Sequence, residues 1–168
     1  MLVVANTSPL IGLVRIGCQD VLPRLYGSVV IPTEVATELA SPKRPAEVRA
    51  FIAVRPTWLS VRSPAKLQEI EDLDVGERAA ISLARELNAD LLLIDENKGR
   101  QAAIGFGLRT ARTAAVLFDA ANAGAIPDLA EVFSNLKATN FRVPHKVLDE
   151  LLRRHQRIKS EGTNTPKP

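Results

Sequence analysis

Short apolar runs alternate along this chain with longer stretches that carry a helical pattern. The runs LVVA (2–5), SVVI (28–31) and LLLI (91–94) show no polar alternation on either face, which is typical of buried parallel strands. WLSV (58–61) and LRTA (108–111) are weaker candidates of the same kind. Strands that alternate with helices predict an α/β fold with right-handed crossovers and a central parallel sheet of four or five strands.

Proline and glycine mark where the helices between these strands should begin. Ser8 followed by Pro9 predicts a capped helix that runs through Arg15. Pro32 is expected to open the helix after the second strand, and Gly76 to precede the helix before LLLI.

The C-terminal segment differs from the rest of the chain in charge. Residues 1–144 carry 16 basic and 16 acidic residues, so the net charge of +3 resides beyond them. The neutral body gives no general case for nucleic-acid binding, whereas the basic end gives a local one. One apolar stripe predicts an amphipathic helix over residues 145–160 that packs on its own domain, a second subunit or another protein. We expect one domain over 1–144 and a disordered tail over 161–168.

Composition argues against several classes of site and compartment. Cys18 is the single cysteine, so an intramolecular disulfide and a zinc–thiolate cluster are excluded, and a reducing cytoplasm is expected. His145 and His155 both lie near the C-terminus, which argues against a histidine-based metal site or triad. No apolar run reaches the roughly 18–20 residues that span a bilayer, so no membrane association is expected.

Oxygen-bearing side chains follow the predicted strands. Asn6 ends the first strand, Asp95 and Glu96 follow LLLI, Glu38 lies on the helix after SVVI, and Glu77 lies in a first helical turn. In open parallel sheets, ligands collect beyond the carboxyl ends of the strands, so these groups should meet at one rim. Clustered carboxylates repel one another unless a cation neutralises them, and Mg²⁺ or Mn²⁺ prefers such oxygen ligands.

Each of these residues also has an ordinary structural explanation. Asn6 could cap a turn, and Glu38 could be a solvated helix residue. Glu77 could complement a helix dipole, and Asp95 or Glu96 could cap the next helix. These local explanations do not predict all four segments at one rim.

Four blocks follow one another in a fixed order and cover residues 1 to about 126: NTSPLIGLVRIG, VVIPTEVATEL, LDVGERAAISLARELNADLLLIDENKGRQAA and GLRTARTAAVL. Together they resemble the PIN-domain family, most closely a subgroup similar to VapC-type toxins. The resemblance implies a PIN-like three-layer α/β/α fold. It also implies metal-dependent ribonuclease activity with Mg²⁺ or Mn²⁺.

Carried over residue by residue, the resemblance implies metal ligands at Asn6, Glu38, Glu77 and Asp95, with Glu96 sharing or replacing the role of Asp95. Glu38, Glu77 and Asp95 would be the catalytic acids. Ser8 matches the small hydroxyl residue that supports the first ligand. Asn6 departs from the family pattern, because it stands where relatives carry a charged Asp.

The leading hypothesis is therefore a Mg²⁺- or Mn²⁺-dependent endoribonuclease, acting as the toxin of a toxin–antitoxin pair. RNA would be its substrate, an antitoxin its partner and a homodimer its assembly. The neutral Asn6 keeps a second hypothesis open, in which a weak or inactive PIN-like module binds RNA or protein. A third is a phosphatase or other phosphodiesterase that uses the same acids.

Overall fold

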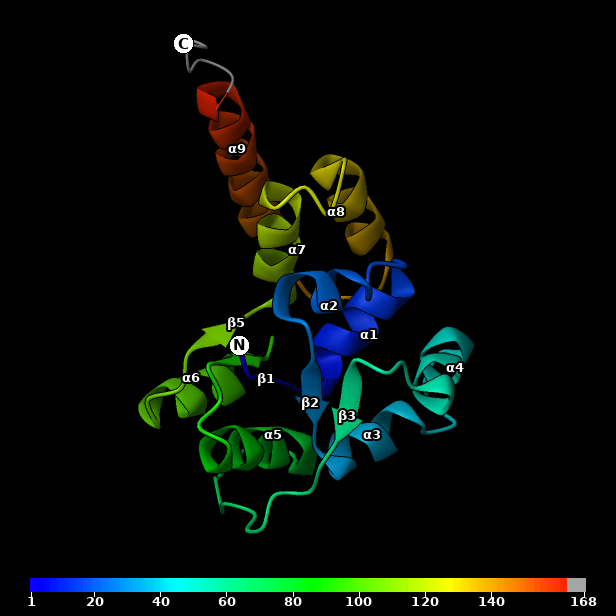
Figure 1. The fold of residues 1–168 in the computed structure, drawn as a ribbon, viewed down its shortest axis with the longest axis vertical. Coiled ribbons are helices and arrows are strands. Elements are labelled where there is room, and N and C mark those ends of the chain that lie inside the picture. The colour runs from blue at the N-terminus through cyan, green and yellow to red at the C-terminus, as the bar shows by residue number, and fades with distance from the viewer. Residues whose placement is uncertain (163–168) are drawn as a thin grey trace. The chain divides into compact units, whose positions relative to one another are not determined.

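Five short strands form one parallel sheet in the order β3-β2-β1-β4-β5 (Figure 1). They are β1 (Val3–Ala5), β2 (Val29–Ile31), β3 (Leu59–Val61), β4 (Leu91–Leu93) and β5 (Thr110–Ala111). Each strand lies within one of the five predicted runs, the two weaker candidates included. The predicted α/β fold with a parallel sheet is confirmed.

The computed structural model describes residues 1–162, which fall into two units that divide after Thr113. The first unit holds the sheet and its flanking helices α1 (Thr7–Arg15), α2 (Val21–Tyr26), α3 (Thr33–Leu39), α4 (Ala46–Val54), α5 (Val75–Glu86) and α6 (Asn97–Gly105). From the boundary onward the chain forms α7 (Thr113–Asn122), α8 (Leu129–Ala138) and α9 (His145–Gly162). The division into a domain over 1–144, a helix and a tail stays a prediction. The helix α9 includes residues 161 and 162, and the rest of the expected tail lies outside the described residues.

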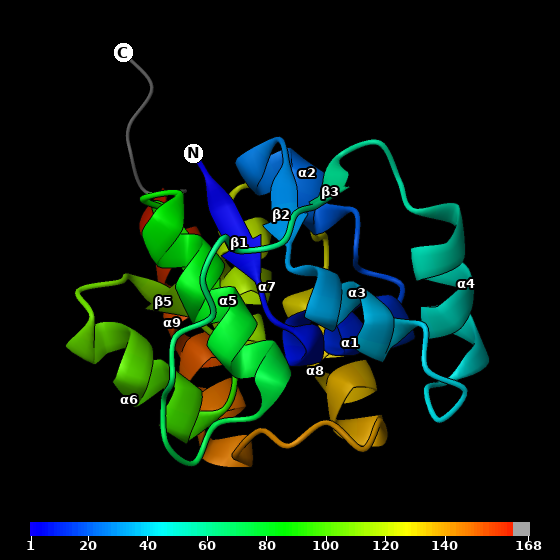
Figure 2. The same cartoon turned by 90° about the horizontal axis from the view of Figure 1, so that it is seen from below.

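β1 lies at the centre of the sheet, and its three apolar residues are fully buried. Val3 pairs in register with Val29 on one side and with Leu91 on the other. The helix α5 packs on β1 and β4, and Ile81 joins a fully buried cluster with Leu92 and other apolar residues. The helices α3 and α5 lie side by side (Figure 2). These contacts bring the first turn of α5 close to the carboxyl end of β1.

The start of α1 differs from the prediction. The helix begins at Thr7, and Asn6 rather than Ser8 holds the N-cap position, with extended backbone angles. The Asn6 side chain makes no capping hydrogen bond in the helix. Both Asn6 and Ser8 instead donate to Glu96, so a contact distant in sequence takes the place of the local cap.

The start of α5 also differs from the prediction. Gly76 lies inside the first turn, because Asp74 caps the helix and Val75 begins it. Asp74 accepts from the Glu77 N–H at 2.8 Å, and the Glu77 carboxylate accepts from the Asp74 N–H at 3.0 Å. This reciprocal capping box fixes the helix start two residues before the point that glycine suggested.

In the second unit, α8 and α9 pack against each other. His155 is buried, and its Nδ1 lies 2.6 Å from the side-chain oxygen of Asn122. The guanidinium of Arg154 lies over the ring of Phe118, 5.2 Å from its centroid. None of the helices in residues 1–162 has the length and apolar character that crossing a membrane requires.

Candidate metal centre

Neighbouring parallel strands bring Asn6 and Glu96 together. Asn6 follows β1 and donates its backbone N–H to the Leu93 carbonyl of β4 at 2.9 Å, which extends the ladder by one bond. Its side-chain Nδ2 donates to Glu96 Oε2 at 3.3 Å, and the Ser8 hydroxyl donates to Glu96 Oε1. Ser8 was predicted to support the first ligand, and in the structure its hydroxyl contacts Glu96. The contact joins residues about ninety positions apart at one edge of the sheet.

The last turn of α3 directs Glu38 toward the same edge. The Thr7 hydroxyl donates to Glu38 Oε2 at 2.7 Å. The other carboxylate oxygen accepts from the guanidinium of Arg44, which follows α3 in the loop before α4. Glu38 therefore differs from the solvated helix residue of the alternative explanation, because both of its oxygens have partners.

Glu77 both caps helix α5 and lies close to the acids of the site. It is the third residue of α5 and forms half of the capping box with Asp74. Only 6% of Glu77 is exposed. A β-carbon at Gly99 would lie 2.8 Å from Glu77 Oε1 and 2.6 Å from Ile94 Cδ1. Glycine at 99 therefore lets α6 approach both side chains closely.

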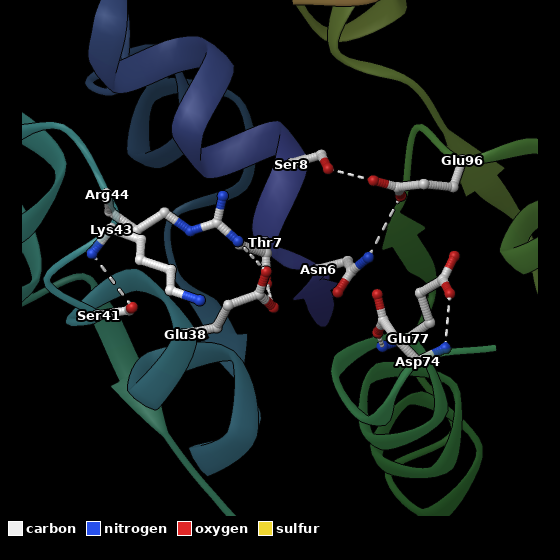
Figure 3. A network of polar contacts seen from close by, with 10 residues as sticks. All are labelled: Asn6, Thr7, Ser8, Glu38, Ser41, Lys43, Arg44, Asp74, Glu77 and Glu96. Carbon is white, nitrogen blue, oxygen red and sulfur yellow. Dashed lines mark hydrogen bonds and ion pairs between the residues drawn. The ribbon is translucent and has the colours of Figure 1, made fainter.

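The side-chain oxygen of Asn6 is a buried acceptor that has no donor among the described residues. Asn6 is 3% exposed and lies between Glu38 and Glu96 (Figure 3). A β-carbon added at Gly76 would lie 3.0 Å from Glu38 Oε2, 3.4 Å from Asp74 Oδ1 and 3.6 Å from Asn6 Oδ1. Three oxygen atoms from three segments thus surround one space that the absent side chain of Gly76 leaves open.

Negative charge accumulates at this edge. Burial raises the pKa of Glu77 above its usual range, and the nearby charges of Asp74, Glu96 and Glu38 raise it further. The hydrogen bond from the backbone of Asp74 opposes the increase. A raised pKa here means that the folded chain disfavours the ionised carboxylate in the absence of a cation.

Asp95, the strand-end acid expected as a ligand, makes its hydrogen bonds with Thr113 and, among the described residues, none with Asn6. Its two carboxylate oxygens accept from the Thr113 N–H at 2.9 Å and the Thr113 hydroxyl at 2.7 Å. Burial raises the pKa of Asp95 to about 6, against the opposing effect of these hydrogen bonds. The structure therefore gathers Glu96, the predicted substitute, with Asn6, Glu38 and Glu77. The reason is that consecutive side chains in extended backbone point to opposite sides, so only one of the two acids can face Asn6.

The chemistry of this donor set suits a hard divalent cation, because every donor is oxygen. Among residues 1–162, no three carboxylate, imidazole or thiol side chains stand together in a way that could hold an ion. The neutral oxygen of Asn6 is the one amide donor beside the carboxylate oxygens of Glu38 and Asp74 near Gly76. It is buried, it has no donor, and it faces the space beside Gly76.

Three residues of this region are absent from the ligand set that the sequence predicted. Asp74 had a readable signal, since D-x-x-E before a helical stretch is a capping box. Thr7 and Arg44 had none, because each reaches Glu38 only through the folded arrangement of α1, α3 and the loop that follows.

The comparisons with known proteins agree with this fold. The family model DUF3368, described as a PIN domain, matches residues 2–157. A solved PilT N-terminus domain protein, SSO1118 from the hyperthermophilic archaeon Sulfolobus solfataricus P2, is similar in structure with a TM-score of 0.54. The two chains are 20% identical, and the match covers 69% of this chain and 90% of that one. No curated protein sequence matched.

Proposed function

This chain belongs to the PIN-domain family, and from that premise we propose that it is a Mg²⁺- or Mn²⁺-dependent endoribonuclease. The observation that carries the proposal is the buried oxygen of Asn6 beside Glu38 and Asp74, which has no donor within residues 1–162. A buried polar atom without a partner costs about 1–3 kcal/mol. A divalent ion in the space beside Gly76 would satisfy that atom and offset the repulsion among the carboxylates.

Asn6, Glu38 and Asp74 would hold the ion from the side of Gly76, and Glu77 and Glu96 complete the proposed set. When bound, the ion lowers the pKa of water and stabilises negative charge on a phosphate group.

The hydroxyl and amide groups of the chain position these ligands. Thr7 fixes one oxygen of Glu38, and Ser8 fixes one oxygen of Glu96. The Asn6 amide donates to Glu96, which leaves its oxygen free to face the ion.

A cleavage assay on structured RNA tests the proposal. The wild-type protein should cleave RNA with Mn²⁺ and not after chelation. Glu77→Ala and Glu96→Gln, purified in parallel, should remove the activity while circular dichroism shows an unchanged fold. Cleavage that persists in both variants, or in the absence of divalent metal, would contradict the proposed site and indicate a contaminating nuclease.

The toxin role, with an antitoxin as partner and a homodimer as assembly, is the finer part of the proposal. Its support is the block order that resembles VapC-type toxins, together with the amphipathic α9, where Ile158 remains 47% exposed. Induced expression should arrest bacterial growth, and Glu96→Gln should not. Relief of the arrest by co-expression of a small neighbouring reading frame would identify the antitoxin.

A second candidate is a PIN-like module that binds RNA or protein with weak or no catalysis. Two observations favour it: Asn6 lacks the charge of Asp, and Arg44 already neutralises Glu38. Calorimetry with Mn²⁺ on the wild type and on Asn6→Asp separates the candidates. Binding by Asn6→Asp alone favours the module, whereas binding by both proteins favours the nuclease.

A further inference from the structure

The loop between α3 and α4 places one arginine directly on a carboxylate of the site. Arg44 donates from its guanidinium to Glu38 Oε1 (Figure 3). The backbone of this turn is held by the Arg44 N–H on the Ser41 carbonyl at 2.9 Å and by Arg49 Nε on the Arg44 carbonyl at 3.2 Å. Arg44 is therefore presented to Glu38 by a fixed turn.

The ion pair occupies a carboxylate that the proposed metal would need. The Thr7 hydroxyl donates to Glu38 Oε2, which is also the oxygen nearest to the β-carbon position of Gly76. The Arg44 guanidinium donates to the other oxygen. A guanidinium and a divalent cation on one carboxylate repel each other, so binding of the ion weakens the hold of Glu38 on Arg44.

Arg44 is also accessible to a ligand from solvent. About a third of the side chain of each partner is exposed, 33% for Arg44 and 34% for Glu38. Three carboxylates lie near Asn6, those of Glu38, Asp74 and Glu96. Within residues 1–162, Arg44 is the one basic side chain that forms an ion pair with any of them. Lys98, by comparison, pairs with Asp72 at 3.6 Å and is 72% exposed.

We propose that Arg44 is a phosphate-binding residue of this site, which neutralises Glu38 in the metal-free protein and passes to an RNA phosphate when a divalent ion takes Glu38. The planar guanidinium matches two phosphate oxygens, as it matches a carboxylate. Exchange of one anion for the other would couple metal loading to substrate binding. This inference rests on the proposed function.

The first test is metal affinity, measured by calorimetry with Mn²⁺ in the absence of RNA. Arg44→Ala should bind Mn²⁺ more tightly than the wild type, by about two- to fivefold, which is the value of an exposed ion pair that the metal no longer has to break. Arg62→Ala is the matched control, since Arg62 forms an exposed pair with Glu86 at 3.4 Å elsewhere in the same unit. It removes the same charge and should leave Mn²⁺ affinity unchanged.

The second test is RNA affinity, measured by fluorescence anisotropy with a short labelled single-stranded RNA. Ca²⁺ replaces Mn²⁺, and a gel checks that the RNA is intact at the end. With Ca²⁺, Arg44→Ala should bind several-fold more weakly, and its plot of log affinity against log salt should be less steep by about 0.7, the value of one phosphate contact on a single strand. Without divalent ions the loss should be smaller, because Glu38 then holds Arg44. Arg44→Lys keeps the charge without the fork and should restore part of the affinity.

The outcomes separate this inference from the function on which it rests. If the wild type binds no Mn²⁺, the metal-dependent function fails and the exchange fails with it. If the wild type binds Mn²⁺ and cleaves RNA, but Arg44→Ala has unchanged or weaker metal affinity, the exchange alone is overturned. An equal loss of RNA affinity with and without Ca²⁺ would also overturn it, since Arg44 would then act as a constant surface charge.

Discussion

Asp95 and Glu96 are adjacent in the sequence, but their carboxylates contact different parts of the first unit. Asp95 accepts both hydrogen bonds from Thr113, at 2.9 and 2.7 Å. Glu96 accepts from Asn6 at 3.3 Å and from Ser8. One acid therefore anchors the start of α7, and the other belongs to the candidate metal centre.

This separation predicts different effects of substitution at the two positions. Glu96→Gln should weaken Mn²⁺ binding by at least about tenfold, the range seen for groups that support a metal site, and change stability little. Asp95→Ala should lower the free energy of unfolding by about 1–3 kcal/mol, because it leaves the buried Thr113 N–H and hydroxyl without acceptors. Calorimetry and urea unfolding measure the two effects. Loss of metal binding in Asp95→Ala at full stability would reverse the assignment.

Asn6→Asp tests whether the first position is a weakened ligand. The new carboxylate would lie among Glu38, Asp74 and Glu96 and would lose the amide donor to Glu96. The metal-free variant should therefore be less stable by about 1 kcal/mol or more, and Mn²⁺ should raise its melting temperature more than that of the wild type. Thermal unfolding with and without Mn²⁺ measures both quantities. A metal-free variant as stable as the wild type would show that the carboxylates do not repel at this place.

Gly76→Ala tests the space beside Gly76. The added methyl group would lie 3.0 Å from Glu38 Oε2 and would narrow the space proposed for the ion. Mn²⁺ binding should be lost with little change in the free energy of unfolding, since alanine favours a helix interior by roughly 0.5–1 kcal/mol. Gly105→Ala is the control, because nothing lies within 4 Å of its β-carbon position. Full Mn²⁺ affinity in Gly76→Ala would place the ion elsewhere.

The second unit should lose stability in mild acid because of His155. Burial lowers the pKa of His155, and the charge of Lys159 lowers it further. The unfolded chain takes up the proton near pH 6.5 but the folded chain only at lower pH, so stability falls as pH drops below about 6.5. His155→Gln cannot titrate, and its unfolding free energy should fall less between about pH 7.5 and pH 5.5. Urea unfolding followed by circular dichroism at both pH values compares the two proteins. An equal acid response in both would exclude His155 as the source.

Local patterns predicted the elements better than they predicted where helices begin. The runs SVVI and LLLI show no polar alternation, which is typical of strands buried on both faces of a parallel sheet. The predicted start of α1 was wrong because the side chain expected to cap the helix forms a different hydrogen bond. Ser8 is a good cap by composition, but Glu96 is a charged acceptor within its reach, and a charged acceptor forms the stronger hydrogen bond.

The residues of the candidate site also fall into those that the sequence could indicate and those that it could not. Asn6, Glu77 and Glu96 could be named from the sequence, because strand ends and helix starts of a parallel sheet converge on one edge. Glu38 lies in the last turn of α3 and was named through the resemblance to the PIN-domain family. Asp74 was also readable as the first half of a capping box. The position of Asp95 could not be read, since the sequence does not show which of two adjacent acids points toward Asn6.

The sequence by itself determined the parallel α/β fold and the edge at which oxygen ligands gather, because apolar periodicity and chain direction are local properties that survive in any packing. Only the tertiary structure decided that Glu96 contacts Asn6 while Asp95 binds Thr113, and that Arg44 pairs with Glu38. It also decided that the oxygen of Asn6 is buried with no donor among the residues that the structure describes. These relationships join segments far apart along the chain. Their energies depend on distances between side chains that exist only after the helices have packed on the sheet.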